Sequence, residues 1–243
     1  MVLTIILKIV QPSGKNNAKG SWKAAFMLFL YAITFSYAYL SLETGTGALI
    51  LFASVQMTMI LVGVISGRKL HLFEWLGVII AFLGFVYLVL PGLATPSLTG
   101  FFLMSVSGIA WGFYTLAGKG SENPLSDTSY NFIRCLPLAM ILIVISIQNS
   151  TLTSEGILLA ILSGAITSGI GYTIWYMALG GLSDIRAAVV QLIVPVIAAF
   201  GGVLFANEAL SMRLVLSSVI ILGGILMVIL GKHYYEHLIS RNS

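Results

Sequence analysis

Residues 72–91 read LFEWLGVIIAFLGFVYLVLP, a stretch of 20 residues in which Glu74 is the only charged one. The hydrocarbon core of a bilayer, about 30 Å thick, is crossed by roughly 20 apolar residues in a helix. Because lipid offers the backbone no hydrogen-bond partner, a stretch this apolar has to cross as a helix. The stretch therefore predicts a transmembrane helix.

Seven further segments have the same character, and turn-forming or charged residues separate them. The predicted spans are 24–41, 46–66, 72–91, 98–117, 130–148, 156–179, 187–206 and 212–231. Hydrophobic residues make up 58% of the 243 residues and charged residues 8%, against roughly 45–50% and 25% in soluble proteins. This composition excludes a disordered chain, a secreted disulfide scaffold and a soluble nucleic-acid binder. The predicted fold class is an all-α polytopic membrane protein.

The lysines and arginines predict the orientation of the spans, because positive residues favour the cytoplasmic side. Only Arg213 lies on one side, and Arg134 is left out because it falls inside a span. The other side carries Lys8, Lys15, Lys19, Lys23, Arg68, Lys69, Lys119, Arg186, Lys232 and Arg241. We therefore expect a multi-pass protein of the inner cell membrane with both termini in the cytoplasm.

The chain shows an internal repeat. An offset of 140 residues aligns 24–91 with 164–231 without a gap and superposes three spans and both loops. The two copies begin on opposite sides of the membrane, so the alignment predicts inverted repeats. The predicted domains are an incomplete first repeat (1–95, three spans and an N-terminal stub), a complete second repeat of five spans (96–232) and a cytoplasmic tail (233–243).

Five motifs, in this order, resemble those of EamA-type permeases of the drug/metabolite transporter superfamily. They are SGIAWGFY (107–114), NFIRCLP (131–137), SGIGYTIWYMA (168–178), AAVVQLIVP (187–195) and FANEAL (205–210). The resemblance covers about residues 22–231. It implies ten helices in two inverted five-helix repeats, of which this sequence lacks the first and most of the second. Such a chain could complete its cavity wall by forming a homodimer. Alternatively, Met1 lies downstream of the true start; the apolar stub Val2–Val10, which resembles the end of a longer helix, favours this second possibility.

Aromatic residues gather on two of the predicted spans. Trp111 and Tyr114 share a helix face, and so do Tyr172, Trp175 and Tyr176. Aromatic side chains with a polar tip can line a cavity and stack on a substrate. Near the end of a span they can equally belong to the interfacial aromatic belt. We predict that Trp111, Tyr114, Tyr172 and Trp175 line the substrate cavity, with the belt as the alternative.

Polar residues inside the spans are further candidates for the cavity. Arg134 is the only charge inside a span, apart from Glu74 and Arg213 at span ends; it either contacts an anionic group of the substrate or snorkels to the headgroups. Asn131 precedes it by three residues and can orient it. Gln56 and Gln191 need hydrogen-bond partners in a membrane, so they line the cavity or bond a neighbouring helix. Pro195 leaves a backbone carbonyl unbonded and is the predicted hinge.

The sequence predicts no catalytic residue, metal site or cofactor. It contains no Walker-type phosphate loop, no Ser-His-Asp set and a single cysteine, Cys135. No carboxylate lies near the middle of a span, which argues against a buried proton relay. The preferred interpretation is a secondary transporter that moves a small organic metabolite, such as an amino acid or a drug-like compound, outward by alternating access. A non-transporting fragment or assembly subunit is the alternative, and a membrane-embedded enzyme is less favoured.

Overall fold

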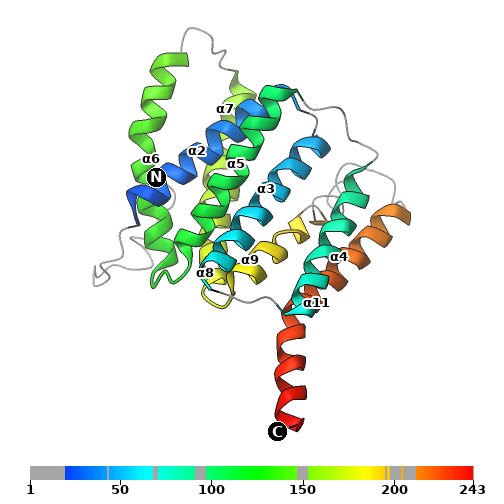
Figure 1. The fold of residues 1–243 in the computed structure, drawn as a ribbon. Helices are drawn as coiled ribbons and strands as arrows, with labels where there is room; N and C mark the ends of the chain where they lie inside the picture. The colour runs from blue at the N-terminus through cyan, green and yellow to red at the C-terminus, as the bar shows by residue number, and fades with distance from the viewer. Residues whose placement is uncertain are drawn as a thin grey trace. The chain divides into compact units, whose positions relative to one another are not determined.

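The computed structural model describes residues 20–42, 44–67, 71–90, 97–146, 153–194, 196–197, 204 and 212–242. Over these ranges the chain is helical and contains no strand (Figure 1). By length and composition, three described helices are able to cross a bilayer, at Leu98–Gly118, Pro124–Ser146 and Ser154–Leu179. Shorter apolar helices lie at Trp22–Ala38, Ile50–Ile65, Leu72–Leu88 and Val215–Val228. The predicted all-α membrane class is confirmed.

The chain divides into two compact units. Unit 1 comprises Met1–Ile33 and Phe113–Leu182, and unit 2 comprises Thr34–Gly112 and Ser183–Ser243. Two helices, α2 (Trp22–Ala38) and α5 (Leu98–Gly118), contribute residues to both units. Each unit is described below by itself.

Unit 1 is built on α6 (Pro124–Ser146), which begins well before the predicted residue 130. The early start has a local cause. Asn123 Oδ1 accepts the Ser126 N–H at 3.1 Å, and Pro124 occupies the first helical position, where its missing N–H costs nothing. Asp127 therefore lies in the first turn of this helix rather than in the preceding loop.

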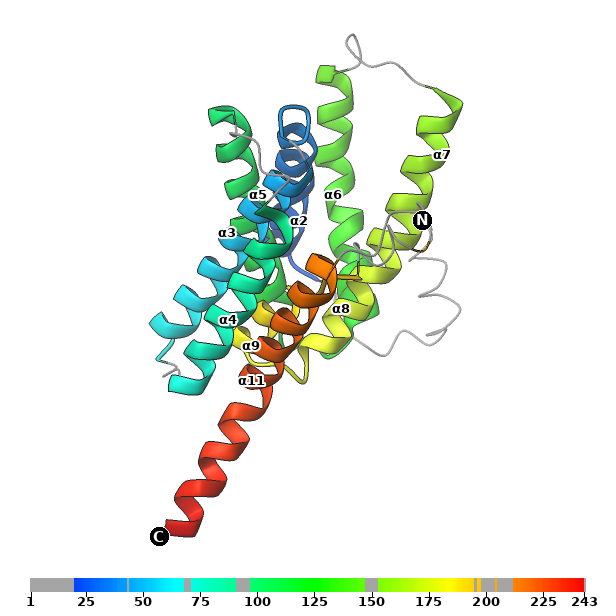
Figure 2. The same ribbon diagram turned by 90° about the vertical axis from the view of Figure 1, so that its right-hand side faces the viewer.

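The predicted span 156–179 is a continuous helical run made of α7 (Ser154–Leu162), η3 (Ser163–Ile170) and α8 (Gly171–Leu179). Its middle part, η3, is π-helical, and π-helical turns are rare in proteins and frequent at functional sites. Both η3 and α8 pack against α6, whereas α7 diverges from it (Figure 2). The run therefore brings the aromatic residues of α8 next to α6.

Unit 2 centres on α4 (Leu72–Val89) and α11 (Met212–Asn242), which lie side by side in Figure 1 and Figure 2. A Cβ built on Gly224 would lie 2.5 Å from Ala81 N and 2.7 Å from Gly77 O, so the two backbones are in direct contact. Small residues permit such close packing of membrane helices. The core around this contact consists of Val78, Ala81, Phe85, Ile185, Val189, Leu192, Val196, Ile221, Ile225 and Val228.

The remaining helices of unit 2 are α3 (Thr44–Ile65) and α9 (Asp184–Val190). The predicted span 187–206 is described only in part, and the predicted hinge Pro195 lies outside the described residues. Just before it the helix tightens, because Leu192 N–H donates to Val189 O at 3.0 Å and Val194 N–H to Gln191 O at 3.1 Å. A proline has no N–H to donate to the carbonyl four residues earlier, which for Pro195 is that of Gln191. Val194 N–H donates to the Gln191 carbonyl instead, in a 3₁₀-type bond.

Candidate functional site

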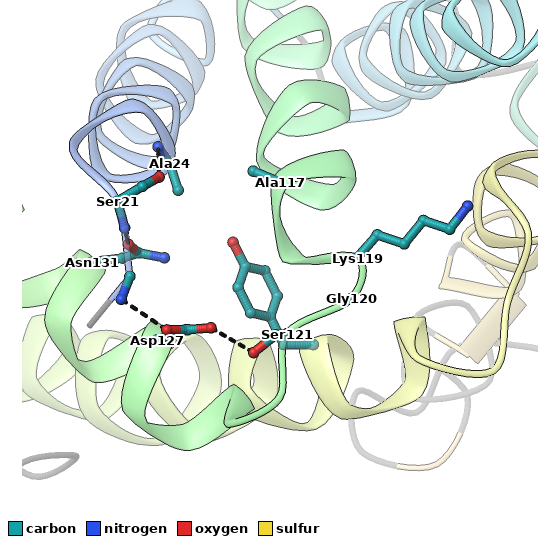
Figure 3. Close-up of a pocket in the computed structure, with 10 residues that line it drawn as sticks. Ser21, Ala24, Ala117, Lys119, Gly120, Ser121, Asp127 and Asn131 are labelled. Atoms are coloured by element: carbon teal, nitrogen blue, oxygen red, sulfur yellow. Dashed lines mark hydrogen bonds between the residues drawn. The ribbon is translucent and has the colours of Figure 1, made fainter. Parts of the chain in front are cut away.

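Unit 1 contains a cavity of about 230 Å³ where α2 and α6 begin and α5 ends (Figure 3). This volume lies below the roughly 300–1,000 Å³ of pockets for drug-sized ligands and suits a small metabolite. The residues that line the cavity are Gly20, Ser21, Ala24, Ala117, Lys119, Gly120, Ser121, Asp127, Asn131 and Tyr176.

Asp127 and Asn131 form the polar wall of the cavity on α6. They lie four residues apart and so share a helix face. Asp127 Oδ1 accepts the Gly20 N–H at 2.7 Å, and its Oδ2 accepts the Ser121 hydroxyl at 2.6 Å (Figure 3). Asn131 Oδ1 accepts the Ser21 N–H at 3.0 Å. The first N–H groups of a helix have no partner within it, so α6 supplies the acceptors for the start of α2.

A cluster of aromatic rings adjoins the cavity through Tyr176. The ring centroids of Tyr176 and Tyr114 are 4.9 Å apart, and those of Tyr114 and Tyr172 are 6.2 Å apart. Tyr172 in turn lies 6.5 Å from Tyr31 and 6.1 Å from Phe132. We call these five residues the tyrosine cluster. The Tyr176 hydroxyl donates to the Tyr114 carbonyl at 3.2 Å, and Tyr114 is fully buried. The structure thus brings together two of the predicted aromatic residues, Tyr114 and Tyr172.

Gly118 and Thr115, both in the last turns of α5, fix the neighbouring aromatic residues. A Cβ at Gly118 would lie within 2.5 Å of three carbon atoms of the Tyr176 ring, so only glycine lets this ring lie against α5. Trp175 Nε1 donates to Thr115 Oγ1 at 3.3 Å. Trp175 therefore packs on the same helix end, but it is not among the residues that line the described cavity.

Arg134 lies three residues beyond Asn131 on α6 and is not among the residues that line the described cavity. Its guanidinium carbon is 5.6 Å from the ring centroid of Trp22 and 5.9 Å from that of Tyr130, the geometry of cation–π contacts. Trp22 is 62% exposed in the isolated chain. The structure therefore gives Arg134 aromatic neighbours, one of them at the start of α2.

The other three predicted site residues belong to unit 2 and form a buried hydrogen-bonded group. Trp111 Nε1 donates to Gln191 Oε1, and Gln191 Nε2 donates to Ala187 O at 3.1 Å. Gln56 Nε2 donates to Ala188 O at 3.2 Å. Both glutamines are 5% exposed. Gln56 Oε1 is buried and accepts no hydrogen bond from the described part of the chain.

The cavity includes residues that the sequence prediction did not select, namely Ser21, Lys119, Ser121 and Asp127. One signal could have found Asp127. The pair Asn123-Pro124 is typical of a helix start, and a helix that begins there places Asp127 on the same face as the predicted Asn131. The partners of these two side chains, more than 100 residues away along the chain, carry no comparable signal.

Comparison with known proteins identifies the family. The model of the EamA-like transporter family matches residues 98–230, more than half of the chain. The chain belongs to the EamA-like transporter family. An uncharacterized Pseudomonas aeruginosa protein is 45% identical to this EamA-like transporter over 212 residues, covering 87% of this chain and 74% of that protein.

Two further similarities agree with this assignment. An uncharacterized transporter of Archaeoglobus fulgidus is 27% identical over 223 residues, which cover 86% of this EamA-like transporter and 79% of the relative. A solved crystal structure shares the fold with a TM-score of 0.75 at 18% identity, covering 93% of this chain and 82% of the other. The resemblance to EamA-type permeases of the drug/metabolite transporter superfamily is confirmed, and the protein is a membrane transporter.

Proposed function

We propose that this EamA-like transporter is a secondary permease that moves a small organic metabolite, such as an amino acid or a drug-like compound, out of the cell by alternating access. The observation that carries the proposal is the cavity of about 230 Å³ in unit 1, where polar side chains meet the rings of the tyrosine cluster. Ligand sites typically combine apolar or aromatic walls with a few placed polar groups. The family resemblance supports the outward direction of the proposal.

In this proposal the substrate is held by side chains of both kinds in unit 1. Asn131 offers an amide to the polar end of the substrate, and Tyr176 offers a ring. Tyr114 and Tyr172 lie behind Tyr176 in the tyrosine cluster and stay candidate contacts. Trp175 borders this group and stays a candidate contact. Tyr176 is the one member of the tyrosine cluster that lines the cavity, and most of the other lining groups are polar, so the proposed substrate is small and largely polar.

Unit 2 holds a separate set of candidate residues. Trp111 and Gln191 are already hydrogen-bonded to each other, and we propose that they fix the position of the helices around them. Gln56 offers the acceptor Oε1, which is buried and unbonded by the described residues. A buried acceptor without a partner costs roughly 1–3 kcal/mol, so a donor group of the substrate would be stabilised there.

The energy source in this proposal is a gradient or an exchange of substrates. The sequence carries no Walker-type phosphate loop, so the chain holds no nucleotide-driven motor of its own. The excess of Lys and Arg on one side of the spans supports an inner-membrane location with both termini in the cytoplasm. Arg134 stays a candidate contact for an anionic substrate group.

The test is release of labelled compounds from proteoliposomes. Vesicles containing the purified full chain are loaded with a ¹⁴C-labelled mixture of L-amino acids, or with ethidium as a drug-like probe. We expect faster release than from protein-free vesicles, and a decrease of about fivefold or more for Asn131→Ala, which removes a hydrogen-bonding side chain. Leu136→Ala, on the same helix at a site 60% exposed, is the matched control. Equal retention of both probes with and without protein would refute the proposal.

The direction needs a separate measurement in cells and everted vesicles. Overexpression of an exporter raises the labelled compound in the medium, whereas overexpression of an importer raises it inside the cell. Uptake into everted membrane vesicles should therefore exceed uptake into right-side-out vesicles. The opposite order would overturn the outward direction while leaving transport itself established.

A further inference from the structure

We propose that Asp127 and Asn131 are a latch in the transport cycle, which holds the start of α2 against α6 and widens the unit 1 cavity when it is released. The inference rests on the proposed transport function and extends it, because it assigns Asp127 a positioning role. The argument comes from the contacts between the two helices.

The two helices meet along a seam of three hydrogen bonds. Residues 127, 131 and 135 follow one another at intervals of four, on one face of α6. Asp127 accepts from Gly20 N–H at 2.7 Å, and Asn131 accepts from Ser21 N–H at 3.0 Å. The Cys135 thiol donates to Ala25 O at 3.2 Å. We call these three contacts the α2–α6 seam; the stacking of Arg134 on Trp22 adjoins it.

The seam is also one wall of the cavity. Half of the ten residues that line the cavity belong to its two sides, namely Gly20, Ser21, Ala24, Asp127 and Asn131. The cavity is already partly open to the surface. Separation of α2 from α6 at this point therefore removes one of its walls and widens it.

When α2 and α6 separate, Asp127 and Ser21 each keep a hydrogen bond within their own segment. This is what a contact that opens and closes requires. Asp127 Oδ2 is bonded by the Ser121 hydroxyl at 2.6 Å, within its own helix–loop segment. Ser21 Oγ accepts the Ala24 N–H at 3.0 Å and so caps α2 by itself. The apolar side chains buried in the first turn of α2, Ala24 and Ala25, are small, and the larger Leu28 is buried one turn further along. A separation confined to the start of α2 therefore exposes little apolar area.

The chain contains a natural reporter of this movement. Cys135 is the only cysteine of the sequence, it is partly buried, and it lies at the seam. A thiol reagent can reach its Sγ atom more easily once α2 has moved away. The rate of modification therefore measures how often the seam is open, without any substrate.

The experiment measures the rate of fluorescein-maleimide labelling of Cys135 in proteoliposomes that contain the full chain. Hydrogen bonds to a charged group are the stronger ones, so Asp127→Ala should raise the labelling rate about 10- to 100-fold. Asp127→Glu should bring the rate back toward wild type, because it restores a carboxylate. Glu122→Gln removes an exposed acid from the neighbouring loop and should label at the wild-type rate.

The results can overturn the latch separately from the transport function. A wild-type labelling rate in Asp127→Ala, or an equal acceleration in Glu122→Gln, would overturn the latch. A lower melting temperature of Asp127→Ala with unchanged labelling at low temperature would also overturn it, because that result indicates a static helix cap. If Asp127→Ala does not fold, Asn131→Ala, which removes one seam bond, should label several-fold faster, and an unchanged rate refutes the latch. Because labelling needs no substrate, this decision stands even if neither transport probe is moved.

Discussion

Two adjacent glycines of α11 have different surroundings, and they provide a matched pair of substitutions. A Cβ on Gly224 would lie 2.5 Å from Ala81 N and 2.7 Å from Gly77 O, both of them backbone atoms of α4. A Cβ on Gly223 would meet nothing within 4 Å. Gly224→Ala therefore has to push the two helices apart, whereas Gly223→Ala adds a methyl group to open space.

The size of the effect can be estimated from the difference between the two variants. Alanine favours a helix interior over glycine by about 1 kcal/mol, and this gain is common to both substitutions and cancels. What remains is the cost of overpacking a close contact, about 1–3 kcal/mol. In a chain of this size 1 kcal/mol corresponds to roughly 2–4 °C in melting temperature. We expect Gly224→Ala to melt about 2–12 °C below Gly223→Ala.

The assay is thermal unfolding of the two purified variants in the same detergent, followed by intrinsic tryptophan fluorescence. Gly223→Ala should melt at or slightly above the wild-type temperature. If the two variants melt at the same temperature, α4 and α11 do not make the backbone contact described above, and the reasoning about unit 2 is refuted.

Three further predictions concern the site residues. Gln191→Leu leaves the Trp111 N–H without its acceptor, so a double-mutant cycle with Trp111→Phe should give a coupling energy of about 0.6–1.7 kcal/mol by thermal unfolding; a coupling near zero contradicts the bond. Gly118→Ala collides with the Tyr176 ring and should reduce probe release several-fold, and unchanged release means that this ring does not shape the cavity. Arg134→Lys should lower the melting temperature by a few degrees with unchanged release, because lysine stacks less well on aromatic rings; weaker transport at unchanged stability would identify a substrate contact.

Much of the fold could be predicted from the sequence because hydropathy reports directly on the length of apolar helices. The predicted start of α6 was wrong for a local reason: residues 126–129 are polar, yet Asn123 and Pro124 begin a helix just before them. The π-helical segment η3 could not be predicted, because small and apolar residues such as those of this segment are equally compatible with i→i+4 and i→i+5 hydrogen bonds. The inverted repeat, its domain limits and the hinge at Pro195 stay predictions.

The candidate site was predictable in part, and the limit is one of sequence distance. Tyr114 and Tyr172 were selected because each sits in a short periodic cluster of aromatic residues. Asp127 was not selected, because the helix start at Asn123-Pro124 was missed and Asp127 was assigned to the preceding loop. Its contact with Gly20, 107 residues away along the chain, has no local signal in the sequence. Gln56 and Gln191 were expected to bond a neighbouring helix or to line a cavity. In the structure Gln56 donates to the Ala188 carbonyl and Gln191 accepts from Trp111.

The hydrogen bond from Gln56 to the Ala188 carbonyl also has a consequence for the time course of assembly. The two residues are 132 positions apart along the chain. At a synthesis rate of roughly 5–20 residues per second, the acceptor is made about 7–26 s after the glutamine. Over that interval helix formation and hydrophobic collapse, which take microseconds, are long finished. The final partner of Gln56 therefore becomes available only at the pace of the ribosome, and unit 2 cannot be completed before translation has passed residue 188.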